Sequence, residues 1–237
     1  MSIKKYIPNF ITSMNALSGS VGVVFALQGR PDLAFIVMLA AAVFDFSDGL
    51  AARLLQAYSP MGKELDSLSD MVSFGVLPAM MLIGTMQAKH VDSWTEVIPL
   101  FLAVMSALRL AKFNVDERQH LDFIGVATPT AAIVCGSLCY FSCKSDALDF
   151  LVATPWFLPA LSVVLGLLLV SEIPMFGMKV AKGNKLFDTK RIVFLCLAAA
   201  ACLFVTVAGL NWSLAVLLIF TVYLAENLIL FILPKKK

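Results

Sequence analysis

The chain has 237 residues, of which 60% are hydrophobic and only 14% are charged, and its formal net charge is +2. Soluble domains are usually less than half apolar and about a quarter charged, so this composition excludes an ordinary soluble protein and indicates an integral membrane protein. The small net charge gives no reason to expect a nucleic acid as a partner. We therefore expect an all-α, polytopic helical bundle in which residues 1–237 form a single membrane domain.

Apolar segments follow one another along the chain, and each comes close to the roughly 20 residues that a helix needs to cross a bilayer. We expect about eight transmembrane helices, at residues 10–28, 31–56, 62–86, 94–113, 126–143, 155–171, 191–208 and 211–233. An even number of spans places both termini on the same side of the membrane.

Basic residues are unevenly distributed between the two sets of connecting segments. One set carries Lys4, Lys5, Lys63, Lys112, Arg118, Lys179, Lys182, Lys185, Lys190, Arg191 and Lys235–Lys237. The other set carries only Arg30, Lys89 and Lys144. Because cytoplasmic loops are enriched in Lys and Arg, the first set is predicted to be cytoplasmic. Both termini, and the turn between the second and third spans, are then cytoplasmic, in a multi-pass protein of the cell (inner or plasma) membrane.

Four carboxylates lie in the middle of the second and third spans. Asp48 and Asp45 are ten and thirteen residues before Tyr58, at the turn, and Asp66 and Asp70 are eight and twelve residues after it. A helix rises 1.5 Å per residue, so both pairs lie about 12–20 Å along their helices from the turn. The two antiparallel spans are therefore predicted to place the carboxylates in two layers, Asp48 with Asp66 and Asp45 with Asp70.

Helical spacing also places these residues on matching faces. Positions i, i+3, i+4 and i+7 share one face of a helix. This spacing is followed in the second span by Asp45, Asp48, Gly49 and Ala52, and in the third by Asp66, Ser69, Asp70 and Ser73. The first span adds polar residues near one face: Asn9, Thr12, Asn15 and Ser18. The three stripes are predicted to converge on one pocket that opens to the cytoplasm.

Converging carboxylates in a low-dielectric pocket need compensation, because they cannot all stay ionised next to one another. One or two divalent cations would supply it, and an all-oxygen set favours Mg²⁺ or Mn²⁺, with Ca²⁺ also compatible. An ion or proton pathway and a purely structural ionic network are the alternatives. Small residues beside the acids (Gly49, Ala52, Gly62) leave room for a bulky ligand, and Arg53 suits phosphate oxygens, so the set fits a phosphoanhydride substrate.

The pattern Asp45-x2-Asp48-Gly49-x2-Ala52-Arg53-x8-Gly62-x3-Asp66-x3-Asp70 resembles the signature of the CDP-alcohol phosphotransferases. These membrane enzymes move a phosphatidyl-type group from a CDP-linked lipid to an alcohol and release CMP. The resemblance implies a two-metal site held by Asp45, Asp48 and Asp66, with Asp70 shared. It also implies that Asp70 is the general base. Residues implied to line the CDP site are Asp48, Gly49, Ala52, Arg53 and Gly62.

Two further stretches resemble the phosphatidylserine synthase branch of that family. They are PNFITSMN at 8–15 and RLAKFNVDERQHLDFIGVATPTAA at 109–132. The second departs from the usual pattern, with Lys112 in place of an arginine and GVATPT in place of G-L-P-x-P-A. The resemblance implies that the substrates are CDP-diacylglycerol and L-serine. It adds Asn9, Thr12 and Asn15 to the expected substrate-binding residues.

Arg109 and Lys112 are predicted near the cytoplasmic end of the fourth span, where either could bind the carboxylate of serine. The same cations would equally bind a phosphate, so a sister transferase that uses glycerol phosphate or an inositol compound stays open. A cation-coupled transporter is the alternative from another class. We expect a catalytic core at about 8–145, additional C-terminal helices at about 155–233, contact with membrane lipids, and a homodimer.

Overall fold

The computed structural model describes residues 6–91, 94–115, 123–175 and 189–232, and it confirms the all-α fold. The N-terminal half contains α1 (Tyr6–Leu27), α2 (Pro31–Leu54), α3 (Pro60–Asp70), the π-helix η2 (Met71–Val76) and α4 (Leu77–Ala88). It is followed by η3 (Trp94–Val97), α5 (Leu100–Val115), α6 (Thr128–Lys144), η4 (Asp146–Leu148), α7 (Asp149–Val152), α8 (Phe157–Val170), α9 (Thr189–Val207) and α10 (Trp212–Ile232).

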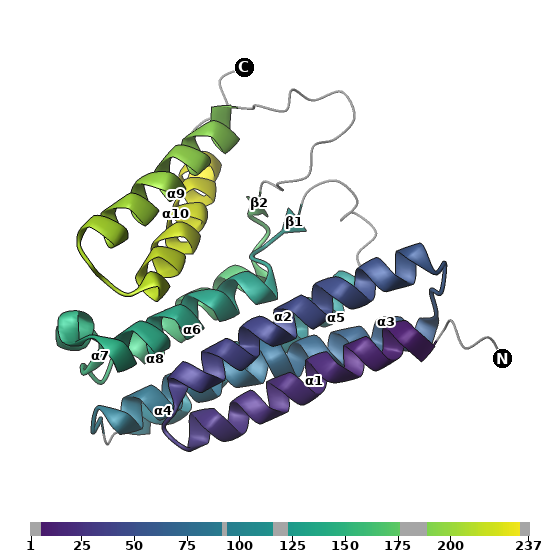
Figure 1. Cartoon of the computed structure of the whole chain (residues 1–237), viewed down its shortest axis with the longest axis horizontal. Coiled ribbons are helices and arrows are strands. Elements are labelled where there is room, and N and C mark those ends of the chain that lie inside the picture. Colours follow the sequence, from purple (N-terminus) through teal and green to yellow (C-terminus); the bar gives the residue numbers. More distant parts are fainter. Residues whose placement is uncertain (1–5, 92–93, 116–122, 176–188, 233–237) are drawn as a thin grey trace.

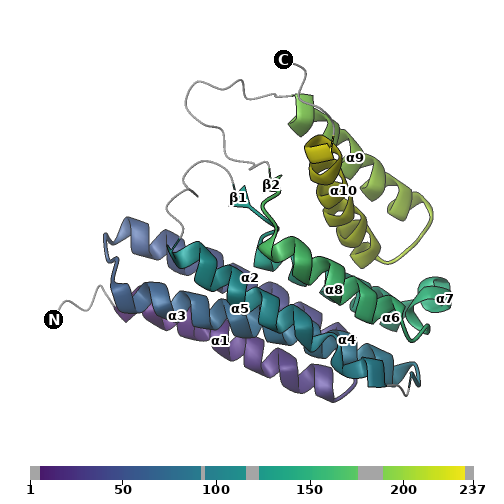
Figure 2. The same ribbon diagram turned by 180° about the vertical axis from the view of Figure 1, so that it is seen from behind.

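The helices α1 to α5 run side by side along the long axis of the molecule, and α6 and α8 pack against them (Figures 1 and 2). α1 pairs with α2 and α3, α4 contacts α6, and α5 packs against α8. The α9–α10 hairpin stands at an angle to this bundle and is joined to it through α10 and α6. The hydrophobic core of the bundle is assembled mainly from α2, α4 and α6. The largest fully buried side chains include Phe35, Phe74 and Phe141.

Each of the eight expected spans coincides with helical structure in the described residues. Four helical segments there are long and apolar enough to cross a membrane: Tyr6–Leu27, Pro31–Leu54, Pro60–Ala88 and Trp212–Ile232. A fifth crossing results if the bent pair Asp146–Val152 and Phe157–Val170 counts as one span. The protein is therefore a membrane protein with several apolar helices. The total of eight spans stays a prediction.

The turn between α2 and α3 is specified by local sequence. α2 ends as Gln56 adopts a left-handed conformation with φ 50°, and the Ala57 N–H donates to the Ala52 carbonyl at 3.0 Å. This bond closes the last turn of the helix in the manner of a Schellman motif. Ser59 is the N-cap residue of α3, and its hydroxyl accepts from the Gly62 N–H at 3.0 Å. Pro60 follows as the first residue of the helix. Both residue types are favoured at a helix start.

The third expected span is continuous but not uniformly α-helical. Immediately after Asp70 it widens into η2, where the Leu77 N–H bonds to the Val72 carbonyl five residues back. The cause lies in Pro78, which has no N–H and whose ring would clash with the carbonyl four residues earlier in a regular α-helix. A wider turn relieves that clash. Single-turn π-helices of this kind are frequent at functional sites.

A two-residue antiparallel pair joins the segments that precede α6 and follow α8. β1 (Phe123–Ile124) pairs with β2 (Pro174–Met175). Beside it the Gly125 N–H donates to the Ile173 carbonyl at 2.9 Å. Gly125 has φ +76°, and a Cβ there would lie 2.6 Å from the Leu169 carbonyl oxygen, so only glycine fits.

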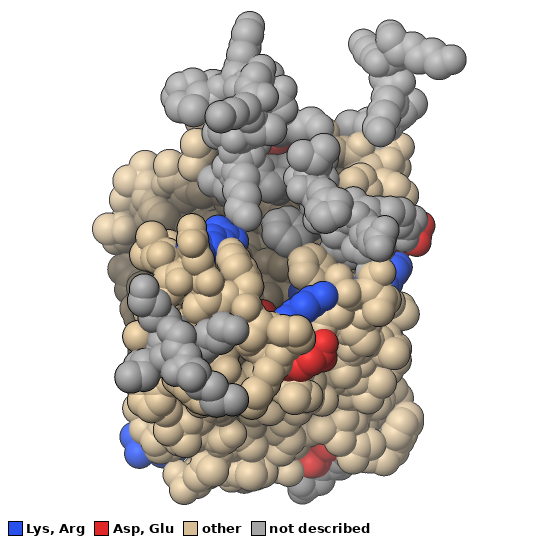
Figure 3. Space-filling model, turned by 90° about the vertical axis from the view of Figure 1, so that its right-hand side faces the viewer, with Lys and Arg blue, Asp and Glu red and all other residues tan. Residues whose placement is uncertain are grey.

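The end of the bundle far from the α2–α3 turn is held by ion pairs. The Lys89 ammonium lies 2.6 Å from Asp149, and Lys144 lies 2.8 Å from Asp32. Both basic residues belong to the sparse set predicted to face away from the cytoplasm. Figure 3 shows the opposite end, where a small number of Lys, Arg, Asp and Glu side chains of the described residues reach the surface. Several basic residues used for the topology prediction, and both termini, lie outside the described residues: Lys4, Lys5, Arg118, Lys179, Lys182, Lys185 and Lys235–Lys237.

Candidate active site

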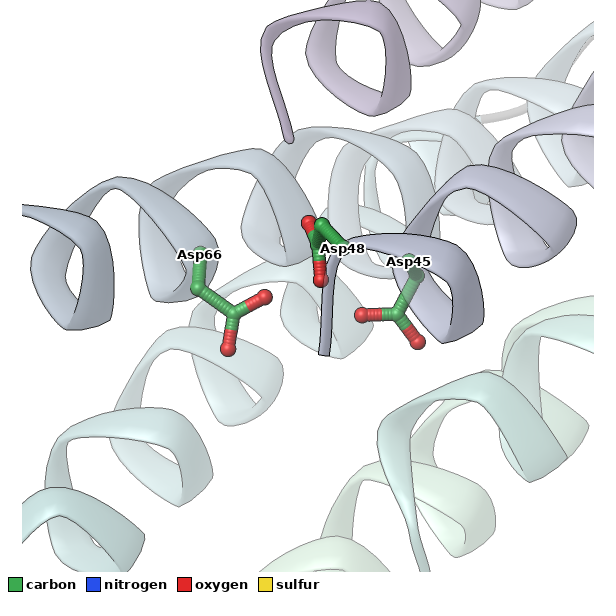
Figure 4. Close-up of side chains that lie close together, drawn as sticks. All are labelled: Asp45, Asp48 and Asp66. Atoms are coloured by element: carbon green, nitrogen blue, oxygen red, sulfur yellow. The ribbon is translucent and has the colours of Figure 1, made fainter. Parts of the chain in front are cut away.

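Three of the four carboxylates meet in one group. Asp45 and Asp48 come from α2 and Asp66 from α3, and each offers an oxygen that lies within 4.8 Å of the others. Figure 4 shows the three carboxyl groups turned toward the same space between the helices. Among the described residues no ion pair is formed by these three acids. Within this part of the chain no salt bridge therefore offsets their mutual repulsion.

The chemistry of this group fits a divalent cation. Asp48 is 5% exposed, and its Oδ2 has no hydrogen-bond partner, although a buried carboxylate oxygen is costly to leave unpaired. The three residues supply only carboxylate oxygens, with no His or Cys among them. Hard cations such as Mg²⁺, Mn²⁺ and Ca²⁺ prefer this donor set.

A cavity of about 190 Å³ lies beside the carboxylates at the α2–α3 turn. Most of the predicted substrate-binding residues line it: Asn9, Thr12, Asp48, Gly49, Ala52 and Gly62, together with Asp66. A Cβ added at Gly49 would meet nothing within 4 Å, so the absence of a side chain there opens the cavity. At Gly62 the same atom would lie 3.0 Å from the Asn9 side-chain oxygen, so the small residue allows α1 and α3 to approach.

Asp70 lies next to the group but is not one of its three members. Its carboxyl approaches that of Asp45 to hydrogen-bonding distance, and its Oδ1 accepts from the Asn15 side-chain amide at 3.1 Å. Asn15 is fully buried, and its backbone carbonyl accepts from the Ser73 hydroxyl at 3.0 Å. Asn15 therefore fixes Asp70 and does not line the cavity, which differs from its predicted place among the substrate-binding residues.

Three predicted cationic residues occupy different environments. Arg53 is exposed and is not among the cavity-lining residues. Lys112 lies 3.6 Å from Glu172 at the end of α8, also away from the cavity. Arg109 is buried, and its Nη1 donates to the Thr128 hydroxyl at 2.9 Å. Its charge lies close enough to Asp70 for the two to interact.

Sequence reasoning did not single out every residue at the site. The cavity is also lined by Pro8, Ala57, Tyr58, Ser59 and Lys63. Lys63 donates to the Asn114 carbonyl at 3.0 Å and so ties the start of α3 to α5. The sequence carried a signal for the lining residues of the α2–α3 turn. A Ser-Pro pair starts a helix, so the turn that precedes it lies beside the cytoplasmic end of the polar stripes. Thr128 had no comparable signal.

Fold and site together define an all-helical membrane protein with a cavity bordered by grouped carboxylates. The family model for CDP-alcohol phosphatidyltransferase matches residues 5–171. That is more than half of the chain, and the chain therefore belongs to this family. It is an enzyme of phospholipid biosynthesis that catalyses CDP-alcohol phosphotransfer, which sets aside the transporter alternative.

Curated relatives agree with this assignment. A CDP-diacylglycerol–serine O-phosphatidyltransferase of Mycobacterium tuberculosis is 34% identical over 202 residues, covering 82% of this chain and 69% of that protein. One of the same name from Methanocaldococcus jannaschii is 28% identical over 227 residues, covering 94% of each chain. An archaetidylserine synthase of Methanothermobacter thermautotrophicus is 34% identical over 134 residues, covering 55% of this chain and 56% of that protein.

Proposed function

We propose that the protein transfers the phosphatidyl group of CDP-diacylglycerol to L-serine, giving phosphatidylserine and CMP. The observation that carries this proposal is the meeting of Asp45, Asp48 and Asp66, the last two of which line a cavity whose wall is opened by Gly49. In the reaction the serine hydroxyl oxygen forms a bond to the phosphorus of the phosphatidyl group. The phosphoanhydride bond breaks, CMP leaves, and the hydroxyl proton passes to a base.

Asp45, Asp48 and Asp66 would hold the divalent cation, Mg²⁺ or Mn²⁺ with Ca²⁺ also compatible, and a second ion would be shared with Asp70. When bound, the ions polarise phosphoryl oxygens and stabilise the charge on the leaving group. Gly49, Ala52 and Gly62 leave space for the cytidine diphosphate moiety, while Asn9 and Thr12 present polar groups from α1 to the same cavity.

Asp70 is the proposed general base. The Asn15 amide donates to Oδ1 of Asp70 and so orients this carboxyl, which lies beside that of Asp45. Proton removal by a positioned base typically accelerates a reaction by about 10²–10⁴-fold. Arg53 and Lys112 do not line the cavity. They are therefore proposed to contact the lipid or the acceptor from outside it.

Serine is proposed over other acceptors for two reasons. The relatives described above carry names in which the acceptor is serine. Arg109 also places a guanidinium near Asp70, where it can pair with the acceptor carboxylate while the base takes the hydroxyl proton. Such charge-assisted pairing is among the stronger hydrogen-bonding interactions in proteins.

The remaining features of the proposal concern placement. The site is proposed to open toward the cytoplasm, because the set of connecting segments predicted from the sequence to share a side with the α2–α3 turn carries most of the basic residues. The protein is proposed to lie in the cell membrane, with the metal site inside its membrane-spanning part. The catalytic core comprises about residues 8–145, and additional helices follow at about 155–233. A homodimer completes the proposal, and cross-linking of the protein in native membranes tests it.

The experiment is an acceptor panel with the purified full chain. CDP-diacylglycerol in mixed micelles is combined with L-serine, glycerol 3-phosphate, inositol or inositol phosphate, each with Mg²⁺, Mn²⁺, Ca²⁺ or a chelator. We expect CMP release and a phosphatidylserine product with serine and a divalent cation. Asp66→Asn should abolish both, whereas Asp146→Asn, an exposed acid at the other end of the bundle, should not. Product formed from a different acceptor, or turnover that survives chelation, would refute the serine or the metal part respectively.

A further inference from the structure

The buried guanidinium of Arg109 has an unusual environment for a cation. Only 9% of the residue is exposed, and within the described residues its one hydrogen bond goes to the neutral hydroxyl of Thr128. The Phe113 ring lies on another side, with its centroid 5.3 Å from the guanidinium carbon. A buried charge without an ionic partner is costly, so this arrangement calls for an explanation.

Asp70 is the natural partner for this cation, yet the two do not form an ion pair. Their charges interact, but among the described residues no Arg109–Asp70 contact falls within the 4.0 Å of a salt bridge. Opposite charges attract strongly in a low-dielectric interior. An arginine side chain has several rotatable bonds, so a fixed anchor is needed to keep Arg109 from swinging onto the carboxylate.

Thr128 has the properties of such an anchor. It is the first residue of α6 and is fully buried, and the N-cap position of that helix is occupied by Ala127, with no side-chain capping bond. The backbone around it is also fixed, since the Val126 N–H donates to the Leu168 carbonyl at 3.1 Å. The Thr128 hydroxyl therefore stands on a fixed backbone. Within the described residues, the hydrogen bond that this hydroxyl makes is the one that it accepts from Arg109.

We propose that Thr128 is a positioning residue that holds the Arg109 guanidinium away from Asp70, so that the arginine is free to bind the acceptor and the aspartate is free to act on it. This inference rests on the proposed function, since it assumes an anionic acceptor at Arg109. If Thr128 is lost, Arg109 pairs with Asp70 or becomes mobile, and the acceptor must compete for it. The effect should then fall on acceptor affinity and not on binding of the lipid donor.

The test compares Thr128→Val, which removes only the hydroxyl from a side chain of similar shape, with Thr128→Ser, which keeps the hydroxyl. Hydrogen bonds to charged groups are strong enough that we expect the KM for serine to rise about tenfold in Thr128→Val. The Kd for CDP-diacylglycerol and the kcat at saturating serine should change by less than about threefold. Thr128→Ser should restore the serine KM to within about twofold of the wild type.

Two controls separate positioning from a general structural effect. Thr85→Val makes the same change at another buried threonine, whose hydroxyl donates to the Met81 carbonyl at 2.8 Å and also approaches the Cys139 thiol, and it should leave the serine KM unchanged. In an Arg109→Gln background, Thr128→Val should have no further effect on the serine KM, because residues that act through one another are not additive.

The possible results distinguish this inference from the proposed function. A wild-type enzyme that does not use serine refutes the proposed function. A serine-using wild type with an unchanged serine KM in Thr128→Val refutes the positioning role alone. The role is also refuted if Thr128→Val weakens lipid and serine binding equally, or if its effect persists undiminished in the Arg109→Gln background.

Discussion

The surroundings of Asp48 differ from those of the acids that pair with lysines between helices. Its Oδ2 is buried without a partner, whereas the carboxylates at the far end of the bundle are paired with Lys89 and Lys144. Acids that hold helices together satisfy their oxygens with donors from the neighbouring helix. The donor-free oxygen of Asp48 is a position at which the proposed cation would bind.

We therefore predict opposite effects of Asp48→Asn with and without metal. In chelator the variant should unfold at a higher temperature than the wild type, because it removes repulsion among three close carboxylates. With Mg²⁺ or Mn²⁺ at about a hundred times the Kd, the wild type should gain about 2–3 kcal/mol of stability and the variant much less. Thermal unfolding in detergent measures both. The same metal-induced shift in the two proteins would argue against a cation at this group.

Gly49 gives a second prediction at the same scale. Because a Cβ there meets open space, Gly49→Ala and Gly49→Leu should fold normally, with unfolding temperatures within a few degrees of the wild type. The leucine would nevertheless occupy the cavity, so the Kd for CDP-diacylglycerol should rise at least about tenfold, with a smaller rise for alanine. Binding measured by calorimetry in micelles decides this. Unaltered affinity in Gly49→Leu would place the lipid headgroup elsewhere.

Much of the site could be predicted from sequence because it obeys helical periodicity. Asp48 and Asp66 were expected in one layer, Asp45 and Asp70 in the next, on facing sides of two helices; Asp45, Asp48 and Asp66 meet, with Asp70 next to them. Arg53 and Lys112 could not be placed in the same way. Their long side chains can turn toward several partners, and which partner is chosen depends on neighbours from other helices, such as Glu172. Side-chain direction at a helix end is a tertiary property.

At the scale of elements, the antiparallel α2–α3 hairpin was predictable because its turn is encoded locally by Ser59 and Pro60. The β1–β2 pair was not, because it joins segments about fifty residues apart and has no alternating pattern of its own. The π-helix was also missed, since the sequence carries only the indirect signal of Pro78. Departures from regular geometry depend on clashes that a period of 3.6 residues does not describe.

The β1–β2 connection can be tested through Gly125. Gly125→Ala should destabilise the protein by more than about 2 kcal/mol, because the left-handed conformation alone costs about 1–2 kcal/mol and the new Cβ would also collide with two carbonyl oxygens. Gly29→Ala is the matched control, with φ +68° and no atom within 4 Å. It should cost only the conformational term. Equal unfolding temperatures for the two variants would contradict the close packing at Gly125.

At the scale of the whole molecule, the C-terminal hairpin is joined to the bundle by an aromatic trio. Trp212 stacks on Phe35 at a centroid distance of 5.8 Å and lies 5.1 Å from Tyr140. Phe35 is thirteen residues before Asp48 on the same helix, or about 20 Å along its axis. The attachment of the hairpin is thus remote from the carboxylates.

This separation predicts that stability and catalysis respond independently. Trp212→Ala should lower the free energy of unfolding by about 1–3 kcal/mol through the loss of two aromatic contacts. Its kcat and both KM values should stay within about twofold of the wild type. Trp156→Ala, which loses one edge contact with Trp94 at an exposed position, should destabilise less. A large loss of turnover in a folded Trp212→Ala protein would instead assign the C-terminal helices a part in catalysis.

The π-helical turn at Met71–Val76 changes the direction in which the side chains of one continuous span point. The two halves of the span can therefore face different neighbouring helices. Before it, α3 presents Asp66 and Asp70 to α1 and α2; after it, α4 packs Leu82 and Met86 into the core. In a uniform α-helix the orientation of every later side chain would be dictated by the position of Asp70. The extra residue absorbed in the wide turn shifts the helical phase, so that the acids face α1 and α2 while Leu82 and Met86 face the core. The π-helical turn thus sets the angle between two faces of the span. One face carries Asp66 and Asp70, where little change is tolerated, and the other packs Leu82 and Met86 in the core, where much is tolerated.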